Sequence, residues 1–318
     1  MRRGGPPALP LDPAAAPPFA RVERSPRGLR FAPTAAPAGA ADPAGEPLRV
    51  SAGAPVRLRR AVLVDEGRLV LGGFPGVAYT VSVPRMQVIH DRRPPGLDLV
   101  AGAPAANAGL LRGEAGWRVV VLPSLGDVIA DAGPGPIAIR ADGRRVAVAV
   151  EGAIEEWDLG ADSAAARHDG VATALAYAAD GSLLVAAGGA VGPPGTGAGA
   201  GSPVALLATA AAAPVTAALH EDGTVSVWRG TPSGAPAAAF ASPVPGAGAL
   251  GLSADGELVE LGSPDGAEPV AALARSADGA QVRRIEGARA IATAPEGAGV
   301  VVAGDWGCAW LTPLEEDA

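Results

Sequence analysis

The stretch IAIRADGRRVAVAV at residues 137–150 carries the pattern that decides the fold of this chain. Short apolar runs flank the pair Asp142-Gly143, as in two β-strands joined by a tight turn. Asp-Gly suits the two central positions of a type I′ hairpin turn, where both residues need positive φ. The same order of strand, Asp-Gly or Glu-Gly turn and second strand recurs in ALAYAADGSLLVAA (174–187), ALGLSADGELVEL (249–261) and AIATAPEGAGVVVAG (290–304).

Asp-Gly pairs punctuate the chain seven times, while no stretch shows a helical period over about 11 residues. This combination predicts an all-β chain rather than alternating strands and helices. Five of the pairs are predicted hairpin turns, at Asp142, Gly143, Asp180, Gly181, Asp222, Gly223, Asp255, Gly256, Asp278 and Gly279.

Tryptophan marks the ends of further predicted strands. TAALHEDGTVSVWRG (216–230) closes on Trp228, and GAIEEWDLG (152–160) contains Trp157-Asp158. These segments resemble the blades of a WD-repeat or related β-propeller, where the third strand of a blade often ends in Trp-Asp. The chain has no Gly-His dipeptide, so the family's buried Asp-His-Ser/Thr-Trp network is not present in full. The resemblance is therefore to a divergent bacterial propeller, with blades that pack through Ala, Gly and Val.

The resemblance implies a single β-propeller over residues 48–313, with about seven (six to eight) four-stranded blades. A flexible leader rich in Pro, Ala and Arg occupies residues 1–47, and an acidic tail occupies 314–318. The final blade lacks an outermost strand, and Leu48-Arg49-Val50 is expected to supply it. The blades are predicted at 57–92, 97–132, 136–168, from 173 onward, 203–241, 248–286 and 289–313, with a flexible Gly-rich insertion at 192–202.

The tryptophans are interpreted as packing residues. Trp117, Trp157 and Trp228 are expected to be wedges between blades. Trp306, Cys308 and Trp310 share one face of a predicted strand, since alternate residues of a strand point the same way. Cys308 is accordingly expected to be a buried, inert thiol.

Charge is distributed unevenly over the 318 residues. All 25 basic residues are Arg, and the net charge is −8. Residues 1–60 hold ten Arg and four acidic residues, a net +6, which leaves −14 for the remainder. Such asymmetry hints at an interaction arm, although a solvated tail explains it as well. The candidate partner-binding residues are Arg21, Arg24, Arg27 and Arg30.

Composition also bears on source and location. The bias toward Ala, Gly, Pro and Arg indicates a GC-rich bacterial genome. A single cysteine rules out an intramolecular disulfide, and no apolar run reaches the length of a membrane helix, about 18 residues. The chain is therefore expected to be cytoplasmic.

No motif predicts catalysis, a cofactor or a metal. Residues 195–200 match G-x-G-x-x-A in form but lack the helix and acidic residue of a dinucleotide site. His90, His168 and His220 have no partner at ligand spacing and are interpreted as surface or turn residues. Glu155 and Glu156 would point to opposite faces of a strand, which argues against an acid–base pair.

The expected function is a non-catalytic protein–protein interaction scaffold. The chain also resembles the propeller components of bacterial ATPase-associated systems, and this resemblance implies that it belongs to a multiprotein assembly. Two alternatives remain: a propeller hydrolase or lyase with a metal in the channel, and binding of an acidic partner or nucleic acid through the Arg-rich leader.

Overall fold

The computed structural model describes residues 135–161, 163–199, 201–263 and 269–293 continuously, and elsewhere the strands named below. These residues form strands, turns and connections and contain no helix, in agreement with the all-β prediction. No helix that is long and apolar enough to cross a membrane therefore occurs in this part of the chain.

The described strands include six four-stranded antiparallel sheets, each built from consecutive strands. The first three sheets comprise β4 (Arg57–Asp65), β5 (Arg68–Phe74), β6 (Val77–Ser82) and β7 (Gln87–Arg92); β8 (Asp98–Ala103), β9 (Ala108–Gly113), β10 (Gly116–Val121) and β11 (Gly126–Ile129); and β12 (Ile137–Ile139), β13 (Arg145–Val150), β14 (Ala153–Asp158) and β15 (Ser163–Asp169).

The next three sheets follow the same pattern. They comprise β16 (Ala174–Tyr177), β17 (Leu183–Ala187), β18 (Ala190–Gly192) and β19 (Ala198–Gly199); β20 (Val204–Thr209), β21 (Val215–His220), β22 (Thr224–Arg229) and β23 (Ala238–Ala241); and β24 (Ala249–Leu252), β25 (Leu258–Gly262), β26 (Val270–Arg275) and β27 (Gln281–Glu286). Each sheet coincides with one of the repeats predicted from the sequence.

The remaining sheet combines strands from distant parts of the chain. It contains β28 (Ala288–Thr293), β29 (Val300–Gly304) and β30 (Gly307–Leu311), followed by β3 (Leu48–Ala52), β1 (Phe19–Ser25) and β2 (Gly28–Pro33). β3 pairs antiparallel with β30, placing Leu48 opposite Trp310 and Val50 opposite Cys308. This pairing confirms the prediction that residues 48–50 supply the missing outer strand. β1 and β2 lie within the predicted leader, whose flexibility stays a prediction.

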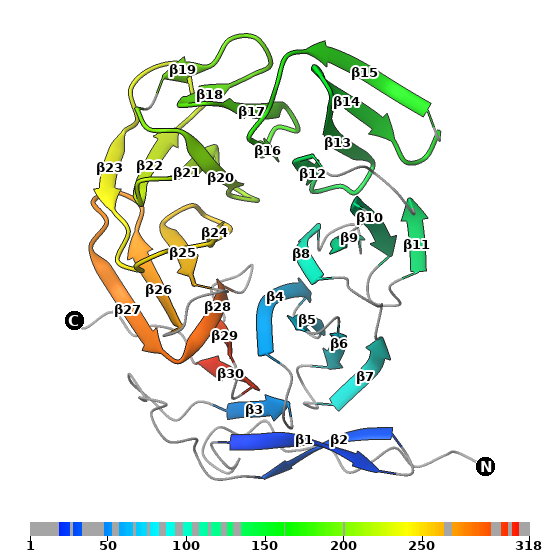
Figure 1. Cartoon of the computed structure of the whole chain (residues 1–318). Helices are drawn as coiled ribbons and strands as arrows, with labels where there is room; N and C mark the ends of the chain where they lie inside the picture. Colours follow the sequence, from blue (N-terminus) through cyan, green and yellow to red (C-terminus); the bar gives the residue numbers. More distant parts are fainter. Residues whose placement is uncertain are drawn as a thin grey trace.

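Successive sheets contact one another through their first strands. β4 contacts β8, β12 contacts β16, β16 contacts β20, and β20 contacts β24, while β28 contacts both β24 and β4. β12 also contacts β9 of the preceding sheet. Figure 1 shows these first strands nearest the middle of the arrangement and the fourth strands at its periphery.

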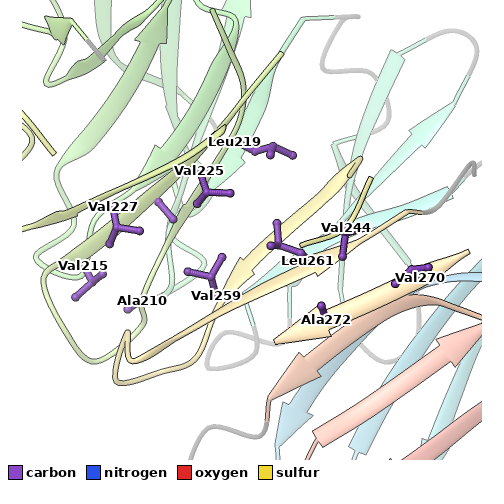
Figure 2. Close-up of a cluster of buried hydrophobic side chains, with 11 residues drawn as sticks. Ala210, Val215, Leu219, Val225, Val227, Val244, Val259, Leu261, Val270 and Ala272 are labelled. Atoms are coloured by element: carbon purple, nitrogen blue, oxygen red, sulfur yellow. The ribbon is translucent and has the colours of Figure 1, made fainter. Parts of the chain in front are cut away.

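The core lies between sheets and is built from small apolar residues. One cluster joins Val215, Leu219 and Val227 of one sheet to Val259 and Leu261 of the next (Figure 2). Gly262 has no side chain at a point where a Cβ would meet the backbone carbonyl of Arg289 in the following sheet. Adjacent sheets therefore approach closely here, as the abundance of Ala, Gly and Val predicts.

The hairpin turns differ from the predicted type. The N–H of Gly181 donates to the carbonyl of Ala178 (2.8 Å), which puts Asp180 at the third and Gly181 at the fourth position of the turn. Gly181 has φ +82°, the left-handed conformation that glycine adopts without strain. The type I′ assignment, with Asp and Gly both central, is therefore wrong for this turn, which is a three-residue hairpin loop. The same hydrogen bond occurs at Gly143, Gly223 and Gly256.

The predicted insertion at 192–202 is also corrected in part. Ala198 and Gly199 form β19, which pairs with Ala190 and Val191 of β18 and completes a four-stranded sheet. A strand of one Ala and one Gly carries none of the apolar alternation by which a strand is predicted from sequence.

Candidate functional site

The turn aspartates use their carboxylates to hold the backbone of the turn. Asp180 Oδ1 accepts hydrogen bonds from the N–H and the hydroxyl of Ser182 (2.9 and 2.6 Å), and these bonds lower its pKa. Each of the other four also accepts a hydrogen bond from the N–H two residues later and has a lowered pKa: Asp142, Asp222, Asp255 and Asp278. These aspartates are explained by turn formation.

Trp228 packs between two sheets. It is 3% exposed and belongs to a cluster with Val204 of its own sheet and Ala174, Ala186 and Val191 of the preceding one. Its Nε1 donates to the carbonyl of Gly234 (3.0 Å). The indole ring is therefore packed by apolar side chains, and its N–H has a hydrogen-bond acceptor. Trp228 therefore contacts side chains of both sheets, and its role as a wedge between blades stays a prediction.

The other tryptophans are placed less completely. Trp157 is half-buried on β14, and Trp117 and Trp310 lie on β10 and β30, each the third strand of its sheet. Their wedge role stays a prediction, and Trp306 lies outside the described residues.

His220 begins the Asp222-Gly223 turn, in line with the interpretation as a turn residue, but its side chain is buried rather than at the surface. It is 2% exposed; its Nε2 lies 2.9 Å from Ser226 Oγ and its Nδ1 lies 2.7 Å from the carbonyl oxygen of Ser202. Ser226 lies two residues before Trp228 on the same strand. The chain thus has a His–Ser pair beside a tryptophan even though it lacks the Gly-His dipeptide.

A second buried polar cluster joins the β12–β15 sheet to the β16–β19 sheet. Glu156 on β14 is 7% exposed. Its Oε1 lies 2.9 Å from His168 Nε2, and its Oε2 accepts a hydrogen bond from the Tyr177 hydroxyl (2.9 Å). Arg145 Nη1 lies 4.0 Å from the same Oε2. We call Glu156, His168 and Tyr177 the Glu156 cluster.

The hydrogen bonds of the Glu156 cluster are those of a structural junction between two sheets. Burial, together with the hydrogen bond to Glu156, raises the pKa of Tyr177 far above its usual value, so the phenol stays protonated and acts as a donor. His168 is half-buried, and the carboxylate of Glu156 holds one of its ring nitrogens. Glu155 instead pairs with the exposed Arg167. The two glutamates therefore engage different partners, in line with the expectation of opposite faces.

Glu260 forms a third polar junction, between β25 and β28. Its Oε1 accepts hydrogen bonds from the Thr293 N–H (2.7 Å) and the Thr293 hydroxyl (2.5 Å). Its Oε2 lies 2.4 Å from the position that a Cβ on Gly251 would occupy. Burial outweighs these hydrogen bonds and raises the pKa of Glu260 to about 7. The carboxyl group therefore changes its charge near neutral pH.

Arginines bridge adjacent sheets near the turns. Arg229 at the end of β22 pairs with Glu257 (3.1 Å) and donates to Ser276 Oγ (3.1 Å), both in the next sheet. Arg140 pairs with Asp142 (2.6 Å), and its aliphatic stem lies beside Gly181 in the turn of the next sheet. These bridges are partly exposed, and surface pairs of this kind typically contribute little to stability.

The remaining predicted residues are placed by backbone alone. Arg21 and Arg24 lie on β1, and Arg30 lies on β2, opposite Glu23; Arg27 lies outside the described residues. His90 lies on β7, distant in sequence from the other histidines. No group of three or more His, Cys, Asp or Glu residues that could hold a metal occurs in the part of the chain that the structure describes.

Several junction residues were missed by sequence reasoning. Contacts between neighbouring sheets are made by side chains that no motif marks: Tyr177, Glu260, Thr293 and Arg229. Glu260 gave one usable signal, since it is a charged residue at an otherwise apolar position of the repeat ALGLSADGELVEL. Comparisons with protein-family models and with curated proteins gave no match.

Proposed function

We propose that the sheets are the blades of a closed, seven-bladed β-propeller and that the protein serves as a scaffold that binds other proteins. The chain of contacts from β4 to β28, with the further contact between β28 and β4, supports closure. Membership of the divergent WD-repeat-like propellers, a bacterial source and a cytoplasmic location belong to the same proposal.

The scaffold role is supported chiefly by how the interior acids and histidines are used. Glu156, His168, His220 and Glu260 each form contacts that join strands or sheets. The histidine contacts fix strands within a sheet, and the bonds of Glu156 to Tyr177 and of Glu260 to Thr293 fix neighbouring sheets relative to one another. A rigid body of this kind can present its turns at either end of the sheets to a partner protein.

Affinity capture with the tagged full-length chain, in cells of the organism that encodes it, tests the scaffold role. Two variants serve as a matched pair: Asp180→Arg, in a turn between first and second strands, and Asp222→Arg, in a turn between second and third strands. Because these turns lie at opposite ends of antiparallel sheets, we expect one variant to lose a partner that the other retains. Absence of any protein enriched above the untagged control overturns the scaffold proposal.

Closure has a separate test. A crystal structure is expected to show β28 packed beside β4 with no gap in the ring of sheets. An open arrangement, with the β4–β7 sheet separated from the last sheet, overturns closure without affecting the capture experiment.

A further inference from the structure

β1 adds to a sheet that is already complete. β28, β29, β30 and β3 provide the four strands found in the other described sheets, and β1 follows at the outer edge of β3 (Figure 1). The pairing is parallel, with Phe19 opposite Arg49 and Val22 opposite Ala52, whereas the other strand pairs of the described part of the chain are antiparallel. The β1–β2 hairpin is therefore an appended element.

The addition of β1 has the geometry of peptide recognition by a sheet edge. An exposed edge strand offers unpaired N–H and carbonyl groups, and an extended segment can bind them through main-chain hydrogen bonds. β1 pairs with β3 over four residues, 19–22. β2 pairs with the other side of β1 and also contacts β7 of the first sheet. The hairpin thus covers the β3 edge and touches the neighbouring sheet.

Tethering strengthens this contact without adding interactions. Fourteen residues, 34–47, connect β2 to β3. A covalent connection of that length keeps β1 near the β3 edge at an effective concentration on the order of millimolar. A short parallel pairing can be occupied in the intact chain even where the same strand, supplied as a free peptide, binds weakly.

We propose that the outer edge of β3 is a strand-docking site, that the β1–β2 hairpin occupies it in cis, and that an extended segment of a partner protein takes the place of β1. This inference deepens the proposed scaffold function and rests on it for the partner. The docking site itself is tested without any partner. The preferred occupant is a segment that resembles residues 19–22, Phe-Ala-Arg-Val, in which apolar residues surround one arginine.

The test releases the hairpin after the protein has folded. A site for a specific protease is placed within residues 34–47 of the full chain, and the folded protein is cut and freed of the released fragment. A fluorescent peptide of residues 17–35 is then titrated by anisotropy against cut and uncut protein. The matched control peptide carries Ala20→Pro and Val22→Pro, which remove backbone donors from the strand.

We expect the natural peptide to bind the cut protein at least tenfold more tightly than the uncut protein, and the proline peptide to bind both weakly. Equal affinity for cut and uncut protein, equal affinity of the two peptides, or no binding at about 1 mM peptide by a cut protein that keeps its circular dichroism spectrum overturns the docking site. Binding of the peptide without any protein captured from cells leaves the docking site standing and removes only the scaffold function.

A second measurement applies if the cut protein unfolds. Hydrogen exchange is compared between the intact chain and the uncut variant with Ala20→Pro and Val22→Pro. Faster exchange within residues 48–52 of the variant supports occupation of the β3 edge by β1. Unchanged exchange at those residues overturns it.

Discussion

Two boundaries between neighbouring sheets solve the same packing problem with different chemistry. Between the β16–β19 and β20–β23 sheets, Trp228 fills a cluster of alanine and valine side chains. Between the β12–β15 and β16–β19 sheets, apolar residues pack beside the buried Glu156 cluster. The apolar boundary depends on filling volume, whereas the polar boundary depends on hydrogen bonds to the carboxylate of Glu156.

Removal of the indole is expected to have the largest effect. Trp228→Ala should lower the free energy of unfolding by about 3–5 kcal/mol, because it leaves a cavity between two sheets. Val171→Ala is the matched control, since Val171 is 68% exposed and its loss should change stability by less than about 0.5 kcal/mol. Chemical denaturation measures both, and similar values for the two variants would contradict the wedge role.

The boundary at Glu260, where β25 meets β28, should have a stability that depends on pH. The Glu260 pKa of about 7 in the fold exceeds the ordinary value of 4.5, so the folded state binds more protons and stability from this group falls as pH rises from about 4.5 to 7. Glu260→Gln should remove this dependence and gain about 3 kcal/mol at pH 8 relative to the wild type. Denaturation from pH 5 to 8 measures it, and parallel pH profiles of the two proteins would refute the assignment.

The turn aspartates should make stability depend on pH in the direction opposite to that of Glu260. Their pKa values are lowered in the fold, so the stability they contribute is present above their ordinary pKa near 3.8 and is lost as pH falls further. Asp180→Asn and Asp255→Asn together should flatten the loss of stability below about pH 4. Acid denaturation followed by circular dichroism measures this change, and the same loss of stability below about pH 4 in the double variant and the wild type would contradict the role of these carboxylates.

Gly256 tests how closely a turn packs against the preceding sheet. Its φ of +74° is unfavourable for other residues, and a Cβ would lie 2.6 Å from Val215 Cγ2. Gly256→Ala should cost about 1–2 kcal/mol. Gly223→Ala is the control, because Gly223 has φ +82° at the same turn position but no atom within 4 Å of its Cβ position, and a cost equal to that of Gly256→Ala would contradict the packing argument.

The hydrogen bond of Tyr177 should have the smallest effect. Tyr177→Phe keeps the ring but deprives Glu156 Oε2 of its donor, at an expected cost of about 1 kcal/mol. A double-mutant cycle with Glu156→Gln isolates the pair, and a coupling energy of zero would show that the two sheets do not depend on this bond.

Local patterns made much of the fold predictable. Asp-Gly turns between apolar runs identified the hairpins, and the periodic spacing of these turns located each sheet to within a few residues. The outer strand Leu48–Ala52 was predictable because a repeat with three strands needs a fourth from elsewhere. β19 was not predictable, since a two-residue strand of Ala and Gly carries no side-chain pattern.

The polar junctions were less accessible to sequence reasoning. The burial of His220 and the meeting of Glu156 with Tyr177 depend on how neighbouring sheets pack, and no spacing rule links residues 21 positions apart. The turn type was misassigned because Asp-Gly occurs both in two-residue type I′ turns and in three-residue hairpin loops. The hydrogen bond from the glycine N–H, which the sequence does not reveal, distinguishes the two loops.

The pairing of β3 with β30 has a consequence for how the protein is made. Residue 48 leaves the ribosome more than 250 residues before its partners in β30. Until then β3 lacks its partner β30, so the last sheet is completed only after the other sheets have been synthesised. Contacts of such long sequence separation fold slowly. A pause in translation after β29 would leave a nascent chain of folded sheets whose two terminal elements remain apart.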